Sequence, residues 1–203
     1  MNEIILLGAG GHAHSCIDVI ELSNQYQIAG LVAELDSNKE RNLRYPILGN
    51  DDDLLNLRKI FNYALVAVGQ IKSPSVRIRL FQRLQELDYK LPVIISPRSY
   101  VSKNAQIEEG TIILHDVMVN TNVKVGKNCI INNKALIEHD AVIGNHCHIS
   151  TGAIINGEVT VGNGSFIGSG TVTKQSVSVG KDCVVGAGVV IKKDIEANVI
   201  IKK

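Results

Sequence analysis

Residues 131–155 read INNKALIEHDAVIGNHCHISTGAII, and this stretch decides the fold. Isoleucine recurs in it at every sixth position, at Ile131, Ile137, Ile143, Ile149 and Ile155. The same period runs from Val101 to Ile191, where Val or Ile fills every place except that of Thr173. A period of six fits neither an α-helix nor one long strand, but it fits short β segments separated by corners. The pattern therefore predicts a parallel β-helix of hexapeptide repeats.

A second series follows each Val or Ile by four residues and holds small or β-branched side chains, from Ala105 to Ile195. Both series are expected to face the interior. The hexad resembles that of the left-handed β-helix acyltransferases, in which three hexads form one triangular coil of about 18 residues. The resemblance implies a left-handed helix. Cys129, Cys147 and Cys183 fall in the second series at whole-coil separations, so we expect them to stack inside the prism as structural residues.

Composition excludes several classes of protein. The 203 residues are 45% hydrophobic and 20% charged, which indicates a globular chain with a sizeable core. The net charge of +1 gives no reason to expect nucleic acid or an anionic membrane as a partner. No apolar run approaches the roughly 20 residues of a membrane span, so a cytoplasmic protein is expected. The four cysteines form no CxxC pair, which argues against a disulfide framework or a zinc ribbon.

The first 95 residues lack the hexad and alternate short apolar runs with helical patterns. Strands are predicted at 4–7, 28–32 and 63–68, and helices from the glycine-rich turn to 22, at 52–59 and at 75–87. This βαβαβ order is half of a doubly wound Rossmann-like sheet, whose ligands bind beyond the carboxyl ends of the strands. Pro92 and Pro97 mark the boundary. We therefore predict an α/β domain at 1–95 and an all-β helix at 96–203.

A glycine-rich turn follows the first strand, and Gly8, Gly10 and Ala13 match the dinucleotide pattern G-x-G-x-x-A. Bare backbone at a helix N-terminus lets phosphate oxygens approach, and Gly10 is expected to permit this approach and a positive φ. Glu34 or Asp36 lies near the place of a ribose-binding acid. The alternative is that the glycines only permit a tight turn. A complete NAD site is less favoured, because only half a Rossmann sheet precedes the repeats.

Four of the six histidines lie in the repeats and outside both inward series: His115, His139, His146 and His148. The core does not need them, and the simplest interpretation of each is an exposed polar corner. A three-histidine zinc site is the sharper alternative, because the γ-carbonic anhydrases build one on this type of fold. The spacing of His139, His146 and His148 does not fit that class. No metal is therefore expected.

The segments IEHDAVIG at 137–144 and HISTGA at 148–153 resemble the core of the PglD/NeuD-like family of bacterial sugar acetyltransferases. The resemblance covers nearly the whole chain and implies acetyl-CoA as co-substrate and a sugar-nucleotide-binding N-terminal domain. It implies that His139 is the general base and that Asp140 raises its basicity. It implies cofactor contacts at His148, Ser169 and Ala187. It also implies sugar-nucleotide contacts at Gly10, Gly11, His12 and Gly69.

The spacing of these residues adds an expectation about assembly. His139 and His148 are half a coil apart, so they should project from opposite sides of one prism. They can share a site only across a subunit interface, which agrees with the homotrimers usual for the family. By contrast, His148, Ser169 and Ala187 are separated by about whole coils and should form a row along one face. A long cofactor could lie along that row.

The leading hypothesis is therefore an acetyl-CoA-dependent enzyme that N-acetylates a nucleotide-linked 4-amino-deoxy sugar for bacterial surface glycan synthesis. Imidazole suits the general base of such a transfer near neutral pH. The segment from Tyr45 to Asp51 resembles family members that act on sialic-acid-type sugars, so O-acetylation of a sialic- or legionaminic-acid-type sugar is the alternative. Two other classes remain, a γ-carbonic-anhydrase-like metal lyase and a non-catalytic scaffold. The His139–Asp140 pair argues against the scaffold.

Overall fold

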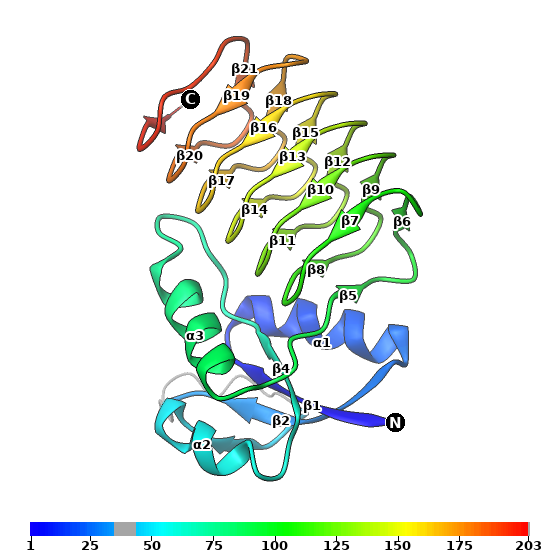
Figure 1. Cartoon of the computed structure of the whole chain (residues 1–203), viewed down its shortest axis with the longest axis vertical. Helices are drawn as coiled ribbons and strands as arrows, with labels where there is room; N and C mark the ends of the chain where they lie inside the picture. Colours follow the sequence, from blue (N-terminus) through cyan, green and yellow to red (C-terminus); the bar gives the residue numbers. More distant parts are fainter. Residues whose placement is uncertain (35–43, 203) are drawn as a thin grey trace. The chain divides into compact units, whose positions relative to one another are not determined.

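The computed structural model describes residues 1–34 and 44–202 and shows two compact units (Figure 1). The first unit comprises Met1–Gly69 and Ser75–Pro92, and the second comprises Gln70–Pro74 and Val93–Lys203. The short segment Gln70–Pro74 therefore leaves the α/β unit and packs with the β-helix before the chain returns to the first unit.

The first unit is a parallel four-stranded sheet with the strand order β3-β2-β1-β4. Its elements are β1 (Asn2–Leu7), α1 (Gly11–Ser23), β2 (Tyr26–Val32), β3 (Ile47–Gly49), the 3-10 helix η1 (Asp51–Asp53), α2 (Leu54–Leu57), β4 (Tyr63–Val66) and α3 (Ser75–Glu86). Successive side chains of a strand point to opposite faces, and Ile4, Ile5, Leu6 and Leu7 are all fully buried. Strand β1 is therefore the centre of this core, as expected for an inner strand of a parallel sheet.

The Rossmann-like βαβαβ order and its three predicted strands are confirmed, with two differences in detail. Strand β3 is missed by the sequence pattern because it is only three residues long, too short to show a period. The helix expected at 52–59 is a 3-10 turn followed by one α turn. Asn50 and Asp53 form a capping box at its start, and Asp residues favour such caps over helix interiors.

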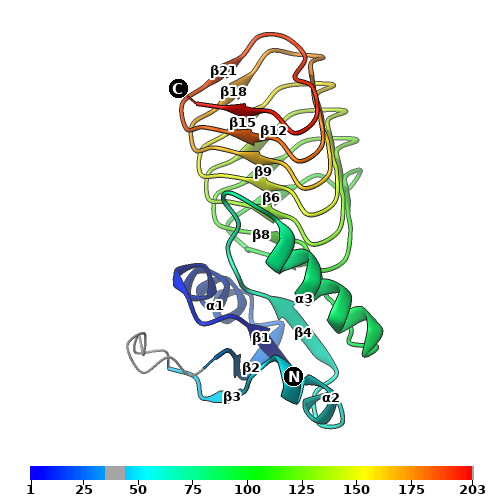
Figure 2. The same cartoon turned by 90° about the vertical axis from the view of Figure 1, so that its left-hand side faces the viewer.

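The second unit is a parallel β-helix whose strands are two residues long and stack into three sheets (Figure 2). The seven-stranded face contains β5 (Ile94–Ile95), β8 (Ile112–Ile113), β11 (Ile130–Ile131), β14 (His148–Ile149), β17 (Phe166–Ile167), β20 (Val184–Val185) and β22 (Ile200–Ile201). The six-stranded face contains β6 (Tyr100–Val101), β9 (Met118–Val119), β12 (Leu136–Ile137), β15 (Ile154–Ile155), β18 (Val172–Thr173) and β21 (Val190–Ile191). The five-stranded face contains β7 (Gln106–Ile107), β10 (Lys124–Val125), β13 (Val142–Ile143), β16 (Thr160–Val161) and β19 (Ser178–Val179).

Except at the last strand, β22, each strand pairs with the strand one coil away in a register of 18 residues, as in the pairing of Lys124 with Val142. The second residue of nearly every strand points inward and is buried. The predicted hexapeptide β-helix is therefore confirmed.

The last coil is two residues shorter than the others. Val184 pairs with Ile200 and Val179 with Ile195, each 16 residues on. Ile195 therefore stacks on the branched inward series, and the expectation that it belongs to the small series is wrong. The extrapolation fails because the sequence period alone does not mark the deletion between 191 and 195.

A ladder of interior hydroxyl and thiol groups runs through successive coils. Its members are Thr111, Cys129, Cys147, Ser165 and Cys183, all buried. Each side chain donates to a carbonyl of the next coil: Thr111 to Gly126 at 2.7 Å, Cys147 to Gly162 at 3.2 Å and Ser165 to Gly180 at 2.8 Å. Hydrogen bonding with Cys129, together with burial, raises the pKa of the Cys147 thiol well above its ordinary value. The three cysteines are therefore structural thiols, as predicted.

None of the helices in residues 1–34 and 44–202 combines the length and the apolar character that a membrane crossing requires.

The ladder predicts a stability effect at Ser165, whose Oγ donates to the Gly180 carbonyl and accepts from the Cys183 N–H at 3.0 Å. Ser165→Ala leaves both groups unpaired in the interior and should lower the free energy of unfolding by about 1–3 kcal/mol. Ser165→Cys is the matched control, because cysteine fills this place in three other coils, and it should lose much less. Equilibrium urea denaturation measures both. Equal losses would show that the ladder contributes nothing beyond side-chain volume.

Candidate active site

His139 and Asp140 lie at the corner between β12 of the six-stranded face and β13 of the five-stranded face. The ring Nδ1 of His139 lies 2.9 Å from Oδ2 of Asp140, and both side chains are about half exposed. Asn122, one coil earlier, donates to the other carboxylate oxygen at 3.1 Å. Asp140 has a φ of 60°, a left-handed conformation that Asp and Asn adopt more readily than most residues. The backbone of this corner and the hydrogen bond from Asn122 therefore hold the Asp140 carboxylate against Nδ1 of the imidazole.

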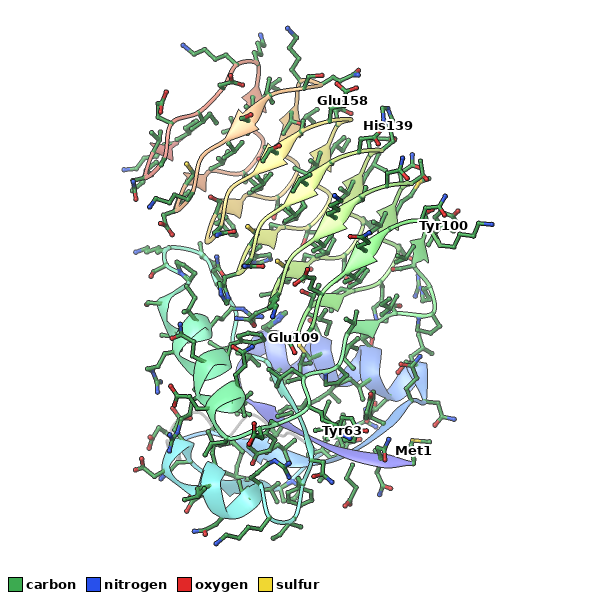
Figure 3. The ribbon with its side chains drawn as sticks, viewed as in Figure 1. Met1, Tyr63, Tyr100, Glu109, His139 and Glu158 are labelled. Carbon is green, nitrogen blue, oxygen red and sulfur yellow. The ribbon has the colours of Figure 1, made fainter. Side chains whose placement is uncertain are left out.

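The electrostatics of this corner favour a strong base. The hydrogen bond that His139 Nδ1–H donates to Asp140 raises the pKa of His139 above its ordinary value, and the charges of Asp140, Glu138 and Glu158 add to the effect. The same hydrogen bond, with that from Asn122, lowers the pKa of Asp140. With the Nδ1 proton directed at a carboxylate, the lone pair of Nε2 is the proton acceptor of the ring. Figure 3 shows His139 and Glu158 at neighbouring corners, both directed outward.

The His139 ring packs over Gly157, in the space that a side chain at position 157 would fill; we call this contact the seat of the ring. Gly157 lies one coil after His139, and a Cβ built on it would come within 2.7 Å of both Cε1 and Nε2 of the imidazole. No ordinary side chain tolerates such a contact, so any larger residue at 157 displaces the ring. The interpretation of the histidines from sequence missed this residue. Its signal was present, because Gly157 follows His139 by 18 residues, the length of one coil.

His148, Ser169 and Ala187 lie on or just after β14, β17 and β20, which are consecutive strands of the seven-stranded face. Ser169 and Ala187 are exposed, and Ser169 Oγ lies 2.9 Å from Ser150 Oγ. His148 is only 7% exposed, and both of its ring nitrogens have hydrogen-bond partners. The three residues thus share a face that does not contain β12, after which His139 lies.

Gly10, Gly11, His12 and Gly69 come from the carboxyl ends of β1 and β4, which are adjacent strands. A Cβ at Gly69 would lie 3.5 Å from Cβ of His12, so the two loops are in contact distance. This is where the order of the sheet reverses, the usual position of ligands in such folds. Gly10 caps α1 without a side-chain hydrogen bond, the first turn has no acidic residue, and a Cβ at Gly10 would meet open space.

The expectation of a positive φ at Gly10 is wrong. Gly10 has a φ of −89°, whereas Gly8 has a φ of 119° and would clash with Val68 if it carried a Cβ. The sharp turn after β1 therefore occurs two residues earlier, and Gly10 leaves the approach to the helix N-terminus open. Glu34 follows β2, and Asp36 lies outside the described residues. Within 1–34 and 44–202, His, Cys, Asp and Glu side chains form no cluster suited to a metal ion.

Comparisons with known proteins agree with this arrangement. Residues 3–84 match the model of the PglD N-terminal domain, and residues 92–203 match that of the GMPPB C-terminal domain. The fold and these comparisons together define a two-domain sugar acetyltransferase of the hexapeptide-repeat class. The predicted resemblance to the PglD/NeuD-like family of bacterial sugar acetyltransferases is thereby confirmed. No protein with a curated description matches the sequence.

Three solved structures illustrate the likeness. PerB from Caulobacter crescentus, in complex with CoA and GDP-perosamine, is 28% identical, with a TM-score of 0.90 over 98% of this chain and 93% of that one. The acetyltransferase domain of PglB from Neisseria gonorrhoeae, in complex with acetyl coenzyme A, is 28% identical, with a TM-score of 0.90 over 98% and 96%. WeeI from Acinetobacter baumannii, 23% identical with a TM-score of 0.85 over 98% and 96%, shares the fold.

Gly157→Ala tests the seat of the imidazole. We expect the new methyl group to push the ring off Asp140, so that the pKa of His139 falls toward its ordinary value in an NMR titration. The free energy of unfolding should change little, because a half-exposed ring can turn outward. The matched control is Gly162→Ala, whose Cβ would meet the backbone nitrogen of Lys181 at 2.5 Å and should destabilise the coil. An unchanged His139 pKa in Gly157→Ala would refute this role.

Proposed function

We propose that the protein transfers the acetyl group of acetyl-CoA to the amine of a nucleotide-linked 4-amino-deoxy sugar, with His139 as general base. The observation that carries the proposal is the His139–Asp140 pair, an exposed imidazole whose Nδ1 is held at 2.9 Å from a carboxylate. Two similar solved structures support this choice of substrates: that of PerB contains CoA and GDP-perosamine, and that of PglB contains acetyl coenzyme A.

The chemistry assigned to His139 is a proton transfer. As the sugar nitrogen attacks the thioester carbonyl, Nε2 accepts a proton from the nitrogen, a C–N bond forms and the C–S bond breaks. The departing CoA sulfur then takes a proton, which regenerates the neutral imidazole. Asp140 stabilises the imidazolium in between, as the carboxylate does in a catalytic triad. A general base contributes about 10² to 10⁴ in rate, and positioning of the two substrates contributes the rest.

The acceptor site is assigned to Gly10, Gly11, His12 and Gly69. Three features of the first unit support a diphosphate there: the uncapped N-terminus of α1, the absence of acidic residues in its first turn, and the open space at Gly10. Backbone N–H groups and the helix dipole attract anionic oxygens at such a place. The α/β domain at 1–95 then binds the nucleotide sugar, and the β-helix at 96–203 carries the base.

The cofactor contacts are assigned to the seven-stranded face, at His148, Ser169 and Ala187. Ser169 and Ala187 are exposed at corners of neighbouring coils, and the distance between stacked strands is about 4.8 Å. An extended molecule such as acetyl-CoA can follow this row. Because His139 lies off this face, the base that serves a given cofactor comes from another subunit in this proposal.

The six-stranded face supports a homotrimer built in this way. Its outward positions are all apolar or aromatic: Tyr100, Met118, Leu136, Ile154, Val172 and Val190. Three of these side chains are more than 40% exposed, at 60%, 42% and 58% for Tyr100, Met118 and Val190. The five-stranded face mostly carries Gln, Lys, Thr and Ser outward, as a solvated surface does. Sedimentation at the mass of one 22.0 kDa chain would contradict the trimer. The proposed location is the cytoplasm.

An acceptor screen tests the function. Purified protein is given acetyl-CoA and either UDP- and GDP-linked amino sugars or free sialic-type acids, and released CoA is detected through its thiol. We expect turnover with a nucleotide-linked amino sugar, and a loss of about 10² to 10⁴ in His139→Ala with no loss of folding. Turnover only with sialic-type acids would identify an O-acetyltransferase. Wild-type turnover in His139→Ala would remove the general base from the proposal.

The pH dependence of kcat/KM tests the role of Asp140. The base must be neutral, so activity rises with pH through the pKa of His139, which lies above the ordinary value near 6.5. Asp140→Asn removes the charge that raises this pKa, so the midpoint should move to lower pH and the plateau should fall because the base is weaker. Asn122→Ala, which leaves the carboxylate in place, is the control and should shift the midpoint less. A shift to higher pH in Asp140→Asn would contradict the assignment.

A further inference from the structure

The residue that follows Gly69 is anchored to the β-helix. Gln70 is only 3% exposed, and its carbonyl oxygen accepts a hydrogen bond from Nδ1 of His148 at 2.6 Å. Its side-chain Nε2 donates to the carbonyl of Gly164 at 3.2 Å. Gln70 opens the segment Gln70–Pro74, which packs with the second unit, whereas Gly69 is the last residue of the preceding part of the first unit. A single peptide bond therefore joins the acceptor loop to this anchor.

The hydrogen bonds around His148 fix its protonation state. Oδ1 of Asn132 accepts from the N–H of Asn133 at 2.8 Å, which turns the amide so that its Nδ2 faces His148. Nδ2 donates to Nε2 of His148 at 3.1 Å, so Nε2 carries the lone pair. The proton must then lie on Nδ1, where it is donated to the Gln70 carbonyl. The ring edge also packs on Phe166, with the centroids 5.1 Å apart at 75°.

Two further observations indicate that the hydrogen bond between His148 and Gln70 positions the backbone next to Gly69 rather than stabilising the fold. Among the described residues, Oε1 of Gln70 is buried without a hydrogen-bond partner, and a buried amide oxygen without a donor costs stability. The Nδ1 of His148 is engaged by the carbonyl of Gln70 at 2.6 Å, so this nitrogen holds the chain and not a ligand, whereas Nε2 faces the amide of Asn132. A buried histidine therefore holds a buried glutamine directly after Gly69, where the chain passes from the first unit into the second.

We propose that His148 is a positioning residue for the acceptor: its Nδ1–H holds the carbonyl of Gln70 and thereby fixes Gly69, the neighbouring residue, for the nucleotide sugar. This inference rests on the proposed acceptor site at Gly69. It differs from the contact with the acetyl group that the family resemblance implies for His148. The two roles use different atoms, Nδ1 for the anchor and Nε2 for a ligand, so they can be separated by substitution.

Asparagine and glutamine separate the two nitrogens of a histidine, because the Asn amide nitrogen reaches the place of Nδ1 and the Gln amide nitrogen that of Nε2. We expect His148→Gln to raise the KM for the nucleotide-linked amino sugar about tenfold, as for the loss of one hydrogen bond, with the KM for acetyl-CoA within about twofold of wild type. His148→Asn keeps the donor to Gln70 and should restore the acceptor KM. The opposite pattern, a raised KM for acetyl-CoA in His148→Asn and an unchanged acceptor KM in His148→Gln, overturns the proposal.

Hydrogen exchange provides a readout that does not depend on any substrate. The backbone amides of 69–76 should exchange faster in His148→Gln than in wild type or His148→Asn, and thermal melts should show that both variants keep the β-helix. Unchanged exchange in His148→Gln overturns the anchor itself. Faster exchange with an unchanged acceptor KM shows that the anchor exists but does not serve the acceptor, which overturns the proposed role. Absence of turnover in wild type with every acceptor is instead a failure of the proposed function.

Discussion

The register of 18 residues between stacked strands is the constraint on which the β-helix and its site depend. Backbone N–H groups of one coil donate to carbonyls of the next, as from Val142 to Val159 and from Gly144 to Val161. A buried backbone group without a partner is costly, so this register cannot slip by one residue without loss across the whole coil. Every side chain is therefore fixed relative to the side chain 18 positions away. The pairs Asn122–Asp140 and His139–Gly157 are direct consequences.

The same constraint decides where chemistry can be placed. The inward positions must be apolar, or must pair with carbonyls as the interior ladder does, so they hold no exposed reactive group. The corners are free of that demand, and successive corners repeat the same left-handed backbone, with φ of 60° at Asn122, 60° at Asp140 and 61° at Glu158. A histidine at a corner therefore has the charged side chains of its own and the neighbouring coils at defined positions, as His139 has Asp140 and Glu158. The pKa of His139 is set by this local arrangement and needs no buried pocket.

The period of six was sufficient to predict the β-helix because the inward positions face a strong packing constraint, and the parallel α/β sheet followed from its apolar runs. The rest was beyond the sequence for physical reasons. The seat at Gly157 needed knowledge that side chains stack at one-coil intervals. The shortened last coil became visible only in the pairing of Val179 with Ile195, because a β-branched residue such as Ile195 fits the pattern of either inward series. The hydrogen bond between His148 and Gln70 could not be predicted, because Gln70 lies 78 residues away and belongs to no motif.

The segment Gln70–Pro74 explains why the two kinds of architecture occur together in one chain. A Rossmann-like sheet offers phosphate-binding loops at the carboxyl ends of its strands. A β-helix offers rigid, evenly spaced corners but no helix N-terminus for a diphosphate. The chain enters the second unit directly after Gly69, so one peptide bond joins the proposed acceptor loop to Gln70, whose hydrogen bonds lie within the β-helix unit. Under the role proposed for His148, the order of that loop depends on the β-helix, which is the part of the chain with the most regular packing.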